Sequence, residues 1–185
     1  MSKLGFRAFD YARDMIPVFN YMTENDSQKW FSHKFQIHNL PMFEQWISRK
    51  FSQNFYHDFF MIETISGKTI GFVYSYEFHE LDAHCKMTLC LFEEYENNGY
   101  GAVAAIKMLN YLFETYPLKQ VFTSVFDYNQ KSLKLNKKGG FTEVGVLPKY
   151  RYWKGEYHDL HILSMTKEYF YERYSKIVTR KSNEK

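Results

Sequence analysis

The stretch Leu89-Cys90-Leu91-Phe92-Glu93-Glu94-Tyr95-Glu96-Asn97-Asn98-Gly99-Tyr100-Gly101-Ala102 is the most informative part of the chain. An apolar strand runs into a short polar loop, and two glycines one residue apart open a long helix. The N–H groups of a helix's first turn have no acceptor within the helix, and the helix dipole adds partial positive charge there. Glycine lets an oxygen approach this backbone, so the stretch predicts an anion site. The alternative is that the glycines only let the helix pack tightly onto a sheet.

Outward from this stretch, the hydrophobic pattern predicts alternating strands and helices. Strands are expected at 4–9, 56–65, 69–78, 83–92, 121–126, 141–153 and 157–166, and helices at 11–22, 41–53, 99–115, 130–138 and from about 167. An antiparallel meander followed by a strand–loop–helix–strand crossover indicates an α/β fold with a sheet of mixed direction. A single domain over 1–175 and a polar tail over 176–185 are expected.

Composition excludes several classes of protein. The 185 residues carry a net charge of +3 from scattered basic residues, which argues against a nucleic-acid binder. Apolar runs are too short for a membrane span, and the N-terminus lacks the apolar segment of a signal peptide. Cys85 and Cys90, five apart in one strand, point to opposite faces, so they are expected to be reduced thiols in a cytoplasmic protein.

Three groups of segments, in this order, resemble the GNAT superfamily of N-acetyltransferases. Residues 95–102 resemble its acetyl-CoA pyrophosphate loop, and residues 129–133 with 138–145 resemble its Asn-x-x-Ser/Ala…Gly-Phe-x-x-x-Gly pattern. Residues 154–159 resemble the hairpin of the RimJ/RimL type, which includes ribosomal-protein and spermidine N-acetyltransferases. The resemblance implies a GNAT-like fold, with a central mixed, mostly antiparallel, twisted sheet and helices on both faces, and acetyl-CoA as co-substrate.

The resemblance also implies which residues hold acetyl-CoA. Backbone groups of Leu89, Cys90 and Leu91 are expected to pair with the pantetheine arm, and Asn129 to hydrogen-bond to it. The main-chain N–H groups that are expected to cradle the pyrophosphate belong to Glu96, Asn97, Asn98, Gly99, Tyr100, Gly101 and Ala102. For Asn129, an ordinary helix N-cap is the competing interpretation.

Two residues depart from the family's pattern. Glu96 stands where the family has Gln or Arg, which places a carboxylate near the pyrophosphate and is expected to weaken binding. Asn136 stands where several relatives carry a tyrosine general acid. The leaving group is a thiolate, and a free thiol has a pKa of about 8.5, so its departure needs little proton assistance. Asn136 is retained as a candidate catalytic residue that donates a hydrogen bond to the sulfur.

Candidate bases follow from the need to deprotonate an amine. Glu77, at a strand end, is the first candidate because relatives that acetylate spermidine carry a carboxylate near this position; a solvated strand-end carboxylate is the alternative. His84 is the second and His79 the third, since a neutral imidazole can relay protons. A histidine on a strand is more often structural, which is the alternative for each of them. The histidines and cysteines lack ligand spacing along the chain, so no metal site is predicted.

The sequence thus predicts direct transfer of an acetyl group from acetyl-CoA to a primary amine, through a tetrahedral intermediate. The acceptor is a peptide or protein N-terminus or a small-molecule amine, because residues 30–35 are neutral to basic and disfavour a polyamine. The alternative is a catalytically weak or inactive acyl-CoA-binding module with a protein partner. Tyr150, Tyr152 and Trp153 are expected either to wall the acceptor cleft or to form a homodimer surface.

Overall fold

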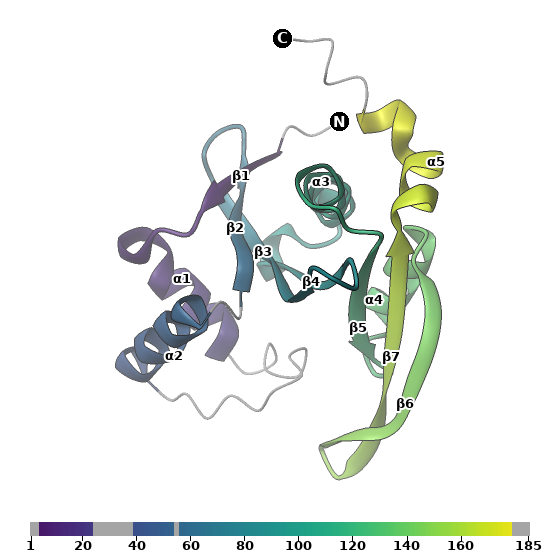
Figure 1. The fold of residues 1–185 in the computed structure, drawn as a ribbon. Helices are drawn as coiled ribbons and strands as arrows, with labels where there is room; N and C mark the ends of the chain where they lie inside the picture. The colour runs from purple at the N-terminus through teal and green to yellow at the C-terminus, as the bar shows by residue number, and fades with distance from the viewer. Residues whose placement is uncertain (1–3, 24–38, 54–55, 179–185) are drawn as a thin grey trace.

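The computed structural model describes residues 4–23, 39–53 and 56–178. Their strands form one seven-stranded sheet in the order β1-β2-β3-β4-β5-β7-β6 (Figure 1). The strands are β1 (Leu4–Ala8), β2 (Tyr56–Thr64), β3 (Thr69–His79), β4 (His84–Leu91), β5 (Gln120–Phe126), β6 (Thr142–Trp153) and β7 (Glu156–Thr166). The helices are α1 (Tyr11–Thr23), α2 (Leu40–Ser52), α3 (Tyr100–Thr115), α4 (Gln130–Lys138) and α5 (Lys167–Val178), with the short 3-10 turn η2 (Glu93–Tyr95) after β4.

Neighbouring strands of the sheet run antiparallel, with the exception of β4 and β5, which run parallel. The connection between these two strands contains α3, as a parallel crossover requires. The predicted mixed, mostly antiparallel sheet is therefore confirmed. Strand β7 lies between β5 and β6, so the C-terminal hairpin closes the sheet on the side away from β1.

Helices cover both faces of the sheet, as predicted. Apolar residues of α1 and α2 pack with one face, and those of α3, α4 and α5 pack with the other (Figure 1). Cys85 belongs to the core under α3 and Cys90 to the core under α1 and α2. The two thiols therefore lie on opposite faces and are unpaired, as their spacing predicted.

Helix α1 is tied to β1 by an ion pair. Asp14 is buried and receives two hydrogen bonds from the Arg7 guanidinium, at 2.7 and 2.8 Å. The Nε atom of Arg7 also donates to Glu63 on β2, at 2.9 Å. A planar guanidinium that binds one carboxylate with two parallel hydrogen bonds fixes orientation as well as distance, and so it sets the position of α1 on the sheet.

The predicted ends of the strands and of the first four helices differ from the observed ends by at most one residue. Helix α5 extends to Val178, so the first part of the expected tail, 176–178, is helical; residues 179–185 lie outside the described part of the chain. The segment expected to carry the acceptor loop, 30–35, also lies outside it. Among the described helices none is both long and apolar enough to cross a membrane.

Candidate active site

Strands β4 and β5 separate after a short stretch of pairing. Their ladder joins only His84–Lys86 to Gln120–Phe122, whereas β4 continues to Leu91 beside β3. Gly71 of β3 lets β4 stay close to β3 as far as Leu91, because a Cβ at that position would collide with the carbonyl of Cys90. The C-terminal half of β4 therefore stays on β3 and leaves β5. Leu89, Cys90 and Leu91, the predicted pantetheine-binding residues, lie on this separated half of β4.

The loop after β4 leads into an open helix N-terminus. Gly99 is the N-cap of α3, has a left-handed backbone (φ 78°) and makes no side-chain capping bond. A Cβ added at Gly99 would meet no atom within 4 Å, and one at Gly101 only the side chain of Leu91 at 3.6 Å. Neither glycine is thus needed for tight packing, which was the competing interpretation. Asn97, Asn98 and Gly99 are exposed, so the first-turn N–H groups face an accessible surface, as an anion site requires.

Two contacts join this loop to the start of α4. The Glu96 carboxylate lies 2.5 Å from the Lys131 ammonium. Asn129 accepts a hydrogen bond from the Ser132 N–H through Oδ1, at 3.1 Å, so it is the N-cap of α4. The Asn129 side-chain oxygen therefore has the ordinary N-cap role that was the competing interpretation. A hydrogen bond from Asn129 to pantetheine remains a prediction.

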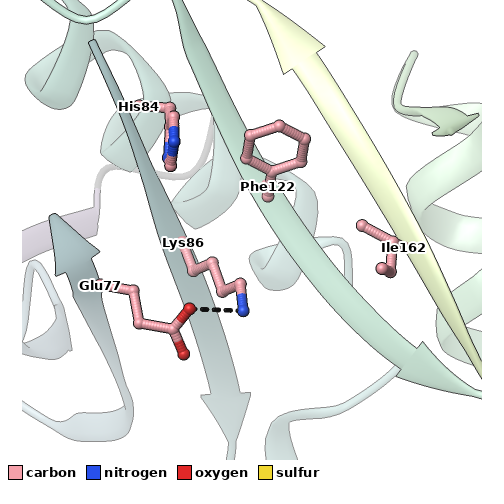
Figure 2. Close-up of a pocket in the computed structure, with 5 residues that line it drawn as sticks. All are labelled: Glu77, His84, Lys86, Phe122 and Ile162. Atoms are coloured by element: carbon pink, nitrogen blue, oxygen red, sulfur yellow. Dashed lines mark ion pairs between the residues drawn. The ribbon is translucent and has the colours of Figure 1, made fainter. Parts of the chain in front are cut away.

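A pocket of about 320 Å³ lies where β4 and β5 begin to separate (Figure 2). Its walls come from β3, β4, β5 and β7: Glu77, His84, Lys86, Phe122 and Ile162. Along β4, His84 and Lys86 line the pocket, whereas Cys85 between them points to the other face of the sheet and packs under α3. The pocket therefore opens on the opposite face of the sheet, the face that α1 and α2 partly cover.

A β-bulge directs Glu77 into this pocket. Tyr76 pairs with Lys86 and His79 with His84, so two residues of β3 stand opposite Cys85 alone. Phe78 packs into the core under α3, and Glu77 is the extra residue, with a left-handed φ of 46°. Bulges commonly re-aim a side chain in this way. The Glu77 Oε2 atom lies 2.5 Å from Lys86 Nζ (Figure 2).

The structure brings two of the four candidate catalytic residues, Glu77 and His84, together in the pocket. His84 lines the pocket with Glu77 and meets Phe122 edge-on, with ring centroids 5.5 Å apart. His79 contacts the His84 ring but does not line the pocket. Asn136 lies on α4, outside the pocket lining, where its Nδ2 atom donates to the carbonyl and the hydroxyl of Ser132, at 2.9 and 3.1 Å.

Three pocket residues were missed by the sequence analysis. Lys86 could have been found, because it lies two residues after His84 on one strand and so shares its face. Phe122 and Ile162 come from strands whose neighbours are fixed only by the tertiary fold. Tyr150, Tyr152 and Trp153 are on β6, outside the pocket lining.

Neither cysteine is suited to nucleophilic attack. Burial raises the pKa of the Cys85 thiol from 9.0 to about 12, with a further contribution from the charge of Asp58. Burial likewise raises the pKa of Cys90 to about 12, although a hydrogen bond with Tyr21 opposes the shift. Because the thiolate is the reactive form, this site favours direct transfer over an acyl-cysteine intermediate.

Comparison with known proteins identifies the family of this chain. Residues 3–142 match the model of the acetyltransferase (GNAT) domain. The chain belongs to the GNAT family. It is an acetyl-CoA-dependent N-acetyltransferase, with an amine as the acceptor. The predicted fold class, activity and co-substrate are confirmed at this level.

Individual relatives agree with this assignment. The chain is 25% identical over 126 residues, 68% of its own length and 70% of the relative's, to the SPbeta prophage-derived uncharacterized N-acetyltransferase YokL of Bacillus subtilis (strain 168). It is 32% identical over 74 residues, 40% of its length and 42% of the relative's, to the uncharacterized N-acetyltransferase YoaA of the same organism. A spermidine N-acetyltransferase from Vibrio cholerae, solved with CoA and spermine, shares the fold with a TM-score of 0.82 at 18% identity, over 90% of this chain and 97% of that one.

Proposed function

We propose that this GNAT enzyme is of the RimJ/RimL type and acetylates a primary amine that carries a single positive charge, such as a peptide N-terminus or a small-molecule amine. One observation supports this most strongly. The open N-terminus of α3 lies beside a separated β4, and a pocket with one carboxylate lies where β4 and β5 diverge.

The co-substrate supplies an acetyl group activated as a thioester, and main-chain groups of this chain are suited to bind it. The N–H groups of Gly99–Ala102 and the preceding loop from Glu96 to Asn98 are proposed to hold the diphosphate. Backbone groups of Leu89, Cys90 and Leu91 are proposed to pair with the pantetheine arm. Two observations support these roles: the space next to Gly99 is free of other atoms, and the C-terminal half of β4 is not paired with β5.

Glu77 is the proposed general base, with His84 as the second candidate. An ammonium has no lone pair, so the acceptor amine must first lose a proton, which the Glu77 carboxylate takes. The neutral amine then adds to the thioester carbonyl, which forms the N–C bond and a tetrahedral oxyanion, and its nitrogen releases a second proton to solvent. The C–S bond then breaks and the thiolate departs. Lys86 holds Glu77 in place through the 2.5 Å ion pair, and His84, across the same pocket, can take the same proton. His79, outside the lining, is the third candidate.

The charges of the pocket support an acceptor with one amine. Among the described residues that line it, Glu77 is the one carboxylate and is paired with Lys86, so these residues offer a polycation no excess of negative charge. Phe122 and Ile162 supply an apolar wall. An amine next to an apolar group, such as a peptide's α-amine with its first side chain, fits these surroundings better than a spermidine.

Departure of the thiolate is proposed to need no tyrosine acid. The Asn136 amide group donates to Ser132 within α4, so it must leave these bonds to reach a sulfur. A thiol pKa of about 8.5 makes the thiolate a fair leaving group without help. Asn136 therefore remains a candidate donor.

The proposal is tested by incubating the protein with acetyl-CoA and a panel of amines, including a tripeptide, a lysine analogue, an arylalkylamine and spermidine. Free thiol and acetylated product are measured for the wild type, Glu77→Ala and Asn136→Ala. Turnover that is fastest with single-amine acceptors and falls in Glu77→Ala supports the proposal. Preference for spermidine would contradict the acceptor assignment. Tight CoA binding without turnover on any amine would instead support a binding module.

Two further expectations belong to this proposal. A homodimer is supported by exposed aromatic residues on the long β6–β7 hairpin, which are Tyr150, Tyr152 and Tyr157. Analytical ultracentrifugation of the wild type and Tyr152→Ser tests it, and a wild-type monomer would contradict it. A cytoplasmic location is supported by two unpaired, buried cysteines, and fractionation of cells that express the protein tests it.

A further inference from the structure

The turn between β3 and β4 gathers three side chains that can bind a metal ion. His79 and His84 are opposite each other across the two strands, and their ring centroids are 4.6 Å apart. Asp82, in the turn that joins them, places Oδ2 3.9 Å from His79 Nδ1. One ligand atom from each of the three residues lies within 4.8 Å of the other two. Spacing along the chain did not reveal this group, because the hairpin creates it.

Backbone contacts hold this turn in shape. The Ala83 N–H donates to the Glu80 carbonyl at 3.3 Å, and Ala83 has a left-handed φ of 56°. The Ala83 carbonyl accepts hydrogen bonds from the N–H groups of Lys119 and Gln120, at 2.7 and 3.3 Å. The turn is thereby fastened to the start of β5. Phe122 supports the His84 ring from one side, so the ligands project from a backbone that is already ordered.

We propose that His79, Asp82 and His84 bind a divalent transition-metal ion, with Zn²⁺ as the best match. Two imidazoles and one carboxylate form a donor set that Zn²⁺ favours, with its fourth position left for water. Mg²⁺ and Ca²⁺ prefer oxygen ligands and are poorly matched by two histidines. The turn His79-Glu80-Leu81-Asp82-Ala83-His84 also carries two carboxylates and no Lys or Arg, which favours a cation.

The distances permit the ligands to close on one ion. Zn²⁺ binds nitrogen and oxygen ligands at about 2.0–2.2 Å, so ligand atoms on one ion lie about 3–4 Å apart. The separations here, up to 4.8 Å, exceed this range by about 1 Å. His79 and Asp82 are exposed, with 51% and 71% of their side-chain surfaces accessible. Because both side chains are exposed, we propose that they rotate toward His84 to close this difference.

The metal site shares one residue with the pocket. His84 is both a ligand and part of the pocket lining next to Glu77. A bound ion would occupy the lone pair of one His84 nitrogen and brace the β3–β4 turn at the pocket's edge. The binding site itself depends only on the hairpin, so it stands whether or not the proposed acceptor and base are correct.

Calorimetry of tag-free protein, stripped with a chelator and titrated with Zn²⁺ in the absence of acetyl-CoA, tests the proposal. We compare the wild type, His79→Gln, Asp82→Asn and the control His161→Gln. His161 is matched because its imidazole also pairs with a carboxylate, that of Glu143 at 2.9 Å, but outside the turn. The ring-nitrogen NMR signals of the histidines identify which of them bind the ion.

We expect the wild type and His161→Gln to bind one ion with equal affinity. Removing even an outer partner of a metal ligand costs about 10–100-fold in affinity, so His79→Gln and Asp82→Asn should each weaken binding at least about tenfold. The ring nitrogens of His79 and His84 should shift with the ion. Absence of binding by the wild type would overturn the site, as would equal binding by all four proteins or a loss confined to His161→Gln. Because Asp82→Asn alters an exposed turn, it also guards against a folding defect in His79→Gln.

Discussion

Lys131 Nζ, in the first turn of α4, lies 2.5 Å from Glu96 Oε2 in the loop before α3. This contact joins the loop that the proposal places around the diphosphate to the start of α4, where Asn129 is expected to hydrogen-bond to the pantetheine arm. Lys131 offsets the negative charge that Glu96 brings to the loop. The ion pair thus explains how a carboxylate is tolerated where relatives have Gln or Arg.

Replacing Glu96 with Gln should therefore strengthen acetyl-CoA binding. The change removes a charge that repels phosphate and releases Lys131 to meet it. Exposed charge interactions contribute about 0.2–1 kcal/mol, so KM for acetyl-CoA should fall by up to about fivefold with kcat unchanged. Steady-state kinetics and CoA titration measure the effect. Glu94→Gln is the control, because Glu94 is a loop carboxylate whose partner Lys68 is 3.9 Å away. A higher KM in Glu96→Gln contradicts this account of the loop.

Glu77→Gln should slow the reaction without weakening acetyl-CoA binding. General-base help is worth about 10²–10⁴-fold, and the loss should be larger for an amine of pKa about 10.4 than for an α-amine near 7.7–8.0. Activity of the variant should recover as the pH rises, because more of the amine is then neutral without a base. The measurement is kcat against pH with both amines.

Glu80→Gln serves as the control for Glu77, because Glu80 is an exposed carboxylate three residues later and lies outside the pocket lining. If Glu77→Gln and Glu80→Gln have equal kcat values at every pH, Glu77 is not the base. His84→Gln then becomes the variant to measure.

Asn136→Tyr should raise kcat, and Asn136→Ala should change it little. A tyrosine restores the acid that several relatives carry at this position, whereas the asparagine amide donates to Ser132 in this structure. The gain has an upper limit of about 10²–10⁴-fold, the usual worth of general-acid help. Single-turnover kinetics of thiol release measure both variants. A large loss in Asn136→Ala would show that the amide itself assists the leaving sulfur.

Both cysteines should resist thiol reagents in the folded enzyme. With pKa values raised to about 12, Cys85 and Cys90 carry little thiolate at pH 8. Compared with a free thiol of pKa about 8.5, the reaction should be slower by about 10³-fold. Ellman's reagent measures the rate, with protein in denaturant as the control. Rapid labelling of the folded enzyme would show that one of the thiols is accessible and ionised.

The same shifts predict a loss of stability in alkali. A thiol whose pKa is raised by folding keeps its proton in the folded protein, while the unfolded chain loses it above pH 9.0. The stabilisation is complete below that pH and is lost as the pH rises toward about 12. Urea unfolding at pH 7.5 and pH 10 should therefore give a lower midpoint at the higher pH. An equal or higher urea midpoint at pH 10 would contradict the raised pKa values of the two thiols.

Local signals predicted much of the fold. Gly99 marked the start of α3, and the odd spacing of Cys85 and Cys90 placed them on opposite faces. Each of these depends on backbone preferences or side-chain alternation within a few residues. The loop from Glu96 to Ala102 could be proposed as a binding site for the same reason, since the chemistry proposed for it comes from consecutive main-chain N–H groups.

Long-range pairing could not be predicted in the same way. The local sequence Tyr76-Glu77-Phe78 does not predict a β-bulge, because the bulge arises from the register of β3 against β4. The contact of His79 with His84 depends on that register too. Ile162 reaches the pocket only because β7 inserts between β5 and β6. The proposed acetyl-CoA loop could therefore be outlined from the sequence, whereas the pocket and the proposed metal-binding turn could not.

Backbone amide NMR during a titration with CoA tests the central claim most directly. If main-chain N–H groups at the start of α3 hold the diphosphate, the largest shifts should fall on Gly99, Tyr100, Gly101 and Ala102. Pantetheine, which lacks the diphosphate, should shift residues of β4 and leave these amides unchanged. Saturable CoA binding that leaves the four amides unmoved, or no binding at all, would contradict the account.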